Sequence, residues 1–282
     1  MRSDFRVARL CAAEAVRDFR LPEYAPFGWI LGAQLLFLGL IAALGTPFGM
    51  LTAGSIARLV LGDDAIHYPG FLLKLPIVAQ RVESFLYAVP GAVLIPLSLI
   101  RILLPSEPET SSTAEVRARL KTAVLPTLTA SLANLVLLEF WQWGFNQSGV
   151  PIMRAILTGF SGAAVTWLIA VLVSFAISTL FIYVPIASVR RGATFRQGLT
   201  VGLRDGLLLF RHTYFFILAF SWPALAFLFV TQLRTAFILQ RMRPEFVPIL
   251  LGIYAVLLSV AGYLTYASAV RLHAAEHRRG RS

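Results

Sequence analysis

A run of 35 residues without a charged side chain extends from Ala155 to Val189. As one α-helix it would be about 52 Å long, whereas the hydrocarbon core of a bilayer is about 30 Å thick. A membrane span can be apolar on every face, which a helix at the surface of a soluble domain cannot. The run therefore predicts a membrane span that either protrudes or begins with a surface turn at Gly159 to Gly162, with Pro185 near its inner end.

The composition agrees with a membrane protein. Hydrophobic residues make up 57% of the chain and charged residues 14%, against about 25% charged residues in soluble domains. The formal net charge of +11 would suggest nucleic acid as the partner of a soluble protein. In a membrane protein the same charge is expected from the positive-inside rule and from contact with anionic headgroups. We therefore predict lipid headgroups, and no nucleic acid, as partners.

Further apolar runs predict an all-α polytopic membrane protein that forms a single integral membrane domain over residues 1–282. The predicted spans are 27–49, 84–104, 122–143, 160–187, 213–232 and 246–270. Residues 51–83 are interpreted as an external segment with short interfacial pieces, and the polar tail after residue 270 is expected to fray. Pro90, Gly91 and Pro96 predict a kink in the second span. No cleaved signal peptide is evident, so the first span is expected to remain as an anchor.

The distribution of basic residues predicts the orientation. With six spans, 18 of the 25 lysines and arginines fall on one side of the membrane and seven on the other. The positive-inside rule then places both termini in the cytoplasm of a bacterial inner membrane.

Two stretches on that side have the pattern of amphipathic helices. In residues 1–23 one stripe holds Phe5, Ala8, Ala12, Val16 and Phe19. Such a helix either lies on the membrane surface or packs on the protein's own cytoplasmic face. Pro22 and Pro26 are expected to end it, and its Cys11 is expected to be an inert packed thiol.

The second stretch, 190–211, contains one acid and five arginines, namely Arg190, Arg191, Arg196, Arg204 and Arg211. Phe195, Leu199, Leu203 and Phe210, with Gly202 and Gly206, form its predicted apolar stripe. We expect an interfacial helix that contacts anionic lipid or a protein partner.

The fourth span carries small residues at every fourth position: Gly162, Thr166, Ala170, Ser174 and Ser178. Such a ridge allows another helix to approach closely. Thr122, Pro126, Ala130 and Asn134 form a similar ridge in the third span, so we predict that these two spans pack together. Gln34, Asn134 and Glu139 are the predicted polar groups in or beside the spans. Gln34 is expected to bond a neighbouring helix, and Glu139 is expected to reach the headgroups or pair with Arg154.

No motif predicts an enzyme. Gly159 to Ala163 reads GFSGA and resembles the GxSG motif of rhomboid proteases, whose serine needs an activating histidine. None of the four histidines lies within a predicted span, and His67 alone falls on the same side as Ser161. The HxxxN of the second span in that family is also absent. Asp63, Asp64 and His67 are too few to predict a metal site. We therefore predict no catalytic, cofactor-binding or metal-binding residues, and no cofactor.

Tyr183-Val184-Pro185, the helix from Phe195 to Phe210, Arg211-His212 and the run from Val16 to Trp29 carry a resemblance. They resemble bacterial six-span membrane proteins of unknown function that are related to the membrane domain preceding some glycerophosphodiester phosphodiesterases. The phosphodiesterase domain is missing here, so the resemblance implies a fold and a membrane location without an activity. The predicted function is a non-enzymatic inner-membrane component that acts through lipid or protein partners at its basic face. The alternatives are a permease or transporter subunit, and an intramembrane enzyme.

Overall fold

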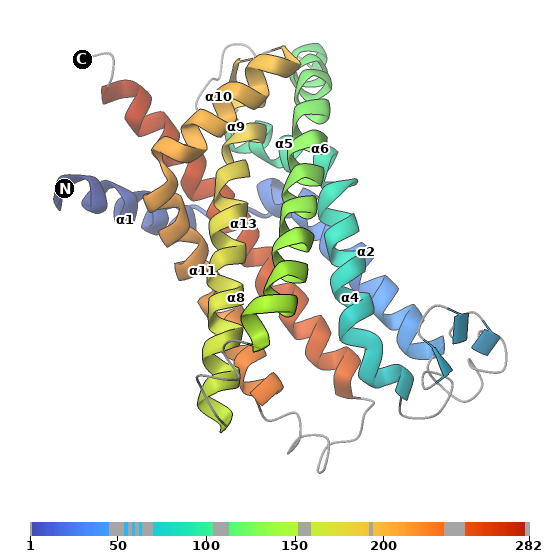
Figure 1. Cartoon of the computed structure of the whole chain (residues 1–282). Coiled ribbons are helices and arrows are strands. Elements are labelled where there is room, and N and C mark those ends of the chain that lie inside the picture. Colours follow the sequence, from blue (N-terminus) through green and yellow to red (C-terminus); the bar gives the residue numbers. More distant parts are fainter. Residues whose placement is uncertain are drawn as a thin grey trace. The chain divides into compact units, whose positions relative to one another are not determined.

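The computed structural model describes residues 2–44, 54–55, 58–59, 62–63, 70–103, 113–151, 159–191, 194–233 and 246–279. Within these ranges the chain is almost entirely helical and has no strand (Figure 1). The predicted all-α class is therefore confirmed for the described residues.

The described helices follow one another along the chain in this order. They are α1 (Arg2–Arg17), α2 (Leu21–Leu44), α4 (Gly70–Ala88), α5 (Gly91–Leu103), α6 (Thr113–Gly144) with the π-helix η3 (Phe145–Gly149), α8 (Gly159–Phe181), α9 (Tyr183–Arg191), α10 (Phe195–Leu208), α11 (Phe210–Leu233) and α13 (Val247–Arg279). The turn predicted at Gly159 to Gly162 is absent, because α8 already begins at Gly159.

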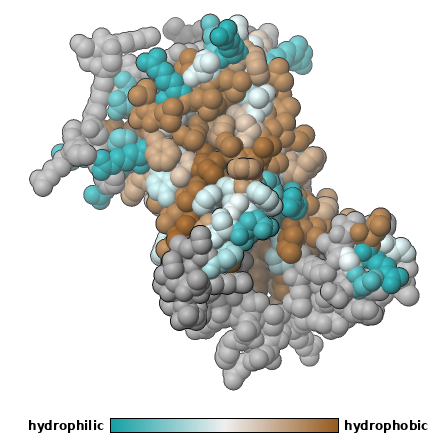
Figure 2. Space-filling view, in the orientation of Figure 1, coloured by the Kyte–Doolittle hydropathy of each residue, from teal (hydrophilic) through white to brown (hydrophobic). Residues whose placement is uncertain are grey.

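Four described stretches are long and apolar enough to cross a membrane: Leu21–Leu44, Val116–Gly149, Leu168–Arg190 and Val247–Glu276. A fifth crossing results if α4 and α5, which are interrupted between Ala88 and Gly91, cross as one span. Apolar residues also cover much of the described surface on the face that Figure 2 shows. The described residues therefore support a membrane protein with four or five candidate spans, and the number six stays a prediction.

The chain forms two compact units. The first contains Met1–Phe27, Ala88–Phe220 and Ala261–Ser282. Its most buried element is α9, in which every residue up to Val189 is buried. Helix α9 contacts α5, α6 and α10. Pro185 lies in its first turn, where the missing N–H breaks no helical hydrogen bond.

Helix α10 packs with its glycines against α8 and α9. Gly198, Gly202 and Gly206 are its buried residues, and their spacing of four places them on one face. A Cβ at Gly202 would lie 2.4 Å from the Cα of Val184, and one at Gly206 would lie 2.4 Å from the carbonyl oxygen of Leu180. Of the predicted apolar stripe, Gly202 and Gly206 are therefore buried against the protein, whereas Phe195 is 43% exposed. Glycine is favourable on this face because, without a Cβ, it lets the backbone of α10 contact the backbones of α8 and α9.

The second unit contains Gly28–Tyr87 and Ser221–Val260. Its core joins α2 to α4, with Phe37, Val78, Val247 and Leu251 packed around the buried residues. Those buried residues are Leu38, Ile41, Phe71, Leu72, Leu75 and Ala79. Apart from the adjacent Phe71 and Leu72, they recur at intervals of three or four along each helix, which places them on facing stripes.

Two predicted boundaries near the N-terminus are wrong. Helix α1 ends at Arg17, and α2 begins at Leu21, before both prolines. Pro22 lies in the first turn, where a proline is favourable. Pro26 lies inside the helix and removes the N–H that would bond the carbonyl of Pro22. The guanidinium of Arg101 donates to that carbonyl instead, at 2.7 Å.

Two further boundaries are also wrong. Residues 70–83, predicted as external, belong to α4, which continues unbroken to Ala88. The polar tail does not fray at residue 271, since α13 continues to Arg279. Leu272 and His273 are 1% and 2% exposed, so tertiary contacts hold this end of the helix.

Candidate functional site

Three helices of the first unit meet at His273 of α13. Its Nδ1 lies 2.8 Å from Nη1 of Arg190 in α9, and its Nε2 lies 2.9 Å from Oδ2 of Asp205 in α10. The histidine side chain is 3% exposed and the aspartate side chain 14% exposed. We call these three residues the His273 network.

The two partners fix the tautomer of the histidine. An arginine can only donate hydrogen bonds, so Nδ1 of His273 must accept and carries no proton. Nε2 then carries the ring proton and donates it to the carboxylate of Asp205. The positive charge of Arg190 and the negative charge of Asp205 are therefore separated by a neutral imidazole, and the network has no net charge.

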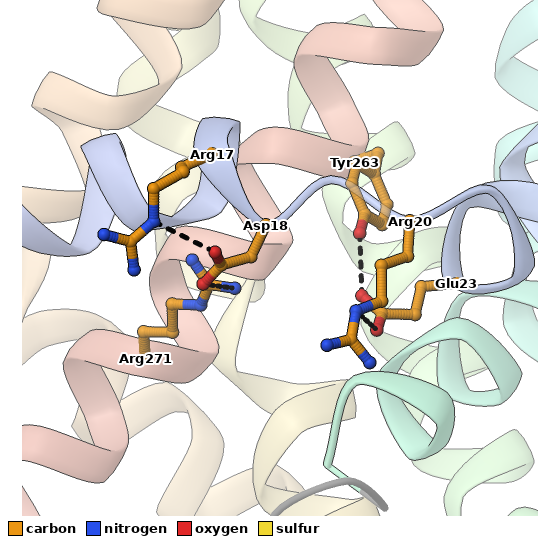
Figure 3. A network of polar contacts seen from close by, with 6 residues as sticks. All are labelled: Arg17, Asp18, Arg20, Glu23, Tyr263 and Arg271. Carbon is orange, nitrogen blue, oxygen red and sulfur yellow. Dashed lines mark hydrogen bonds and ion pairs between the residues drawn. The ribbon is translucent and has the colours of Figure 1, made fainter.

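A second polar network joins the start of α2 to α13 (Figure 3). The hydroxyl of Tyr263 donates to Oε2 of Glu23 at 3.0 Å, and Nε of Arg20 lies 3.9 Å from Oε1. Ser98 of α5 donates to the backbone carbonyl of Glu23 at 2.6 Å. Glu23 is 8% exposed, so Tyr263 and Arg20 stabilise a carboxylate that has lost most of its water, while Ser98 holds the backbone of the same residue.

The link between α1 and α2 is held by charges as well. Asp18 lies 3.1 Å from Nε of Arg17 and 3.4 Å from Nη2 of Arg271 (Figure 3). Nη1 of Arg271 is buried and has no hydrogen-bond partner among the described residues. The exposed Arg17–Asp18 pair is expected to contribute little stability.

Helix α1 packs on the protein's own helices. Ala8 and Cys11 contact Phe216 of α11 and Leu272 of α13 in one apolar cluster, which favours the packing alternative for this amphipathic helix. Its predicted stripe is shifted, since Val16 is 55% exposed. Burial raises the pKa of the Cys11 thiol, and Glu14 acts in the same direction while Arg271 opposes it.

The solvent-facing side of α10 and the start of α11 is basic and apolar at once. Arg196, Arg204 and Arg211 are exposed, and the exposed side chains of Leu207 and Leu208 lie between the last two of them in the sequence. Together with Phe195 we call these residues the α10 surface. Of the other two predicted arginines, Arg190 belongs to the His273 network, and the side chain of Arg191 lies outside the described residues.

Glu83, which was not among the predicted polar groups of the spans, lies in the bent helix pair that could cross the membrane. Glu83 of α4 accepts a hydrogen bond from Nε2 of Gln34 in α2, at 3.4 Å, so Gln34 does bond a neighbouring helix. Glu139 is partly buried in α6. Asn134 of the same helix is also partly buried, and its Oδ1 has no hydrogen-bond partner in the described part of the chain.

The predicted small-residue ridge lies in α8. Thr166, Ala170, Ser174 and Ser178 are partly buried there, and the surroundings of Gly162 lie outside the described residues. Helices α6 and α8 are in contact, and Nε1 of Trp141 donates to the carbonyl of Ala170 at 3.4 Å. Which residues carry the packing of these two helices stays a prediction.

The structure describes only some of the residues that were considered for a metal site or a catalytic serine. Asp63 pairs with Arg58, while Asp64 and His67 lie outside the described residues, as does the side chain of Ser161. Within the described ranges no group of three or more histidine, cysteine or acidic residues could hold a metal ion.

Sequence reasoning missed the groups that form the networks. Asp205 was the one signal available, because it is the single acid among five arginines. Glu23 and His273 lie in segments whose polar composition indicated exposure, and their partners are up to 240 residues away in the chain. No protein-family model, curated protein or solved structure matches this chain.

Proposed function

We propose that this protein is a non-enzymatic membrane component whose α10 surface binds the headgroups of anionic phospholipids. The observation that carries the proposal is the combination of exposed arginines with exposed Phe195, Leu207 and Leu208 on one short helix. Guanidinium groups pair with phosphate oxygens in bidentate geometry. Exposed apolar side chains beside them suit the boundary between headgroups and acyl chains.

The opposite face of α10 supports the same proposal. The glycines press the helix against the backbone of Leu180 and Val184, so α10 cannot roll to bury its leucines without losing that contact. Asp205 is held by His273 and therefore does not neutralise the exposed arginines. The surface is in this way kept basic and outward-facing by the fold beneath it.

The location proposed for the chain follows from its charge distribution. We propose six spans in a bacterial inner membrane with both termini in the cytoplasm, the leaflet surface that carries anionic lipid. Likewise, the similarity to six-span membrane domains that precede some glycerophosphodiester phosphodiesterases is kept as a proposal about fold.

The test is lipid binding by the whole purified protein. Native mass spectrometry in detergent would compare phosphatidylglycerol with phosphatidylcholine for wild type and for the double variant R196E/R204E. At about 1 kcal/mol for each arginine near an anionic surface, loss of two should weaken phosphatidylglycerol binding by at least about 30-fold. Phosphatidylcholine binding should change little.

R58E is the control, because Arg58 is also exposed but lies outside the α10 surface. It should bind both lipids as wild type does. If the double variant keeps the preference for phosphatidylglycerol, the proposal is wrong. If it instead loses a protein that co-purifies with wild type and keeps the lipid preference, the basic surface recognises protein.

A further inference from the structure

The second unit holds a partly buried carboxylate, that of Glu83, beside the apolar interface between α2 and α4. Gln34 lies four residues before Leu38 on α2, and Glu83 lies four residues after Ala79 on α4. Leu38 and Ala79 belong to the buried core between these helices. The pair of Gln34 and Glu83 therefore extends the apolar stripe of that core by one helical turn on each of the two helices.

The polar partners of Glu83 are few. Gln34 is 4% exposed and is its one hydrogen-bond partner among the described residues. Tyr254 of α13 is close enough to interact electrostatically with the same carboxylate. Arg81 is exposed and lies two residues away on α4, which places it about 200° around the helix, on the opposite face.

An ionised carboxylate without a cationic partner is costly in a membrane-embedded interface. Binding a proton removes that cost. A protonated carboxyl and a primary amide can also form two hydrogen bonds, because the acid O–H donates to the amide oxygen while the amide N–H donates to the acid carbonyl. The ionised form can only accept, so it keeps one of these two bonds.

We propose that Glu83 is a proton-binding site in the membrane-embedded part of the second unit, with Gln34 as its positioning residue. The carboxylate takes a proton from water, one O–H bond forms, and no oxidant, metal or cofactor takes part. Reversible protonation changes the number of hydrogen bonds between Gln34 and Glu83 from one to two. This gives the chain a proton-linked step of the kind that proton-coupled transport requires, independently of lipid binding at the α10 surface.

Infrared difference spectroscopy of the whole protein in lipid vesicles tests this proposal. Spectra at mildly acidic minus mildly alkaline pH should contain a carbonyl stretching band of a protonated carboxyl that is lost in E83Q. In Q34L the band should remain but move to higher frequency, because the carbonyl loses its donor. E139Q, a matched change in α6, should leave this band unchanged.

Labelling of the wild-type protein by a membrane-soluble carbodiimide gives a second measurement that needs no variant. The reagent adds to a protonated carboxyl, and the adduct rearranges to an N-acylurea, so the peptide containing Glu83 gains the mass of the reagent. Labelling should fall as pH rises. The proposal is overturned if no band is specific to Glu83, if Q34L leaves that band in place, or if Glu83 is not labelled at any pH.

Discussion

Arg101 replaces a hydrogen bond that Pro26 removes: its Nη1 lies 2.7 Å from the carbonyl oxygen of Pro22. In a regular helix that carbonyl would accept from the N–H of residue 26. Because proline has no N–H, the carbonyl takes a donor from α5 instead. The defect in α2 thus becomes a contact between helices of the first unit.

This substitution of one donor for another predicts coupling between positions 26 and 101. R101A should cost about 1 kcal/mol of unfolding free energy, because it leaves a carbonyl with no protein donor. In a P26A background the cost should be smaller, since the alanine N–H can donate to Pro22. Unfolding of the four proteins of the cycle in detergent measures the coupling, and strictly additive costs would contradict it.

The contact of α10 with α9 predicts that the cost of replacing a glycine by alanine depends strongly on its position. G202A should destabilise the protein by about 1–3 kcal/mol, because the new Cβ would fall 2.4 Å from the Cα of Val184 and backbone must move. Gly32 of α2 is the matched control, since a Cβ there meets nothing within 4 Å. G32A should be neutral or slightly stabilising. Thermal unfolding that treats the two variants alike would count against the backbone contact.

The His273 network predicts that hydrogen bonding, more than side-chain volume, holds the end of α13. H273A should cost about 3 kcal/mol, because it leaves Arg190 and Asp205 without the group between them. H273Q should cost less, since an amide still offers one acceptor and one donor. H212A serves as the control, because Nδ1 of His212 has no hydrogen-bond partner among the described residues. Equal losses for H273A and H273Q, measured by chemical unfolding, would refute this role.

The thiol of Cys11 should react slowly with alkylating reagents in the folded protein. Burial raises the pKa of its thiol, so less thiolate, the reactive form, is present at neutral pH. Alkylation in mild detergent should be slow and should accelerate with rising pH, and denaturant should restore the rate of a free thiol. Because the folded-state pKa is the higher one, the stability linked to this group is present below the unfolded pKa and is lost as pH rises. A folded-state rate equal to the denatured rate would contradict the burial.

Long apolar stretches were predictable from local sequence. Hydropathy alone located α2, α6, α8 and α13, because a helix in lipid needs apolar residues on all faces. It failed at α4, where Lys74 and Arg81 interrupt the apolar pattern, and Glu83 was therefore assigned to an external segment. A charge within an apolar helix is accommodated by a specific partner, and local composition does not reveal which partner.

The predictions for Pro22 and for the C-terminal tail were wrong for related reasons. Pro22 was interpreted as the end of a helix although the first turn of the next helix favours proline equally well. The tail was expected to fray because it is polar, yet His273 is held by residues 68 and 83 positions away in the chain. The predicted basic stretch does contain a helix, α10, but its glycine contact could not be predicted, because glycine packing depends on the backbone that it meets.

The two units offer two different chemistries. The first presents exposed arginines on α10 and α11, and the second holds a carboxyl with an amide partner. The lipid-binding proposal and the proton-binding proposal can each be wrong without the other, because no residue is shared between the α10 surface and the pair of Glu83 and Gln34. Lipid binding and proton binding are therefore measured with separate variants.

Electron paramagnetic resonance of spin-labelled lipids in bilayers tests the central claim most directly. It reports the relative affinity of phosphatidylglycerol and phosphatidylcholine for the perimeter of the reconstituted protein. Wild type should prefer phosphatidylglycerol, and R196E/R204E/R211E should lose that preference while remaining folded. An anionic preference that is the same in both proteins would contradict lipid recognition by the α10 surface.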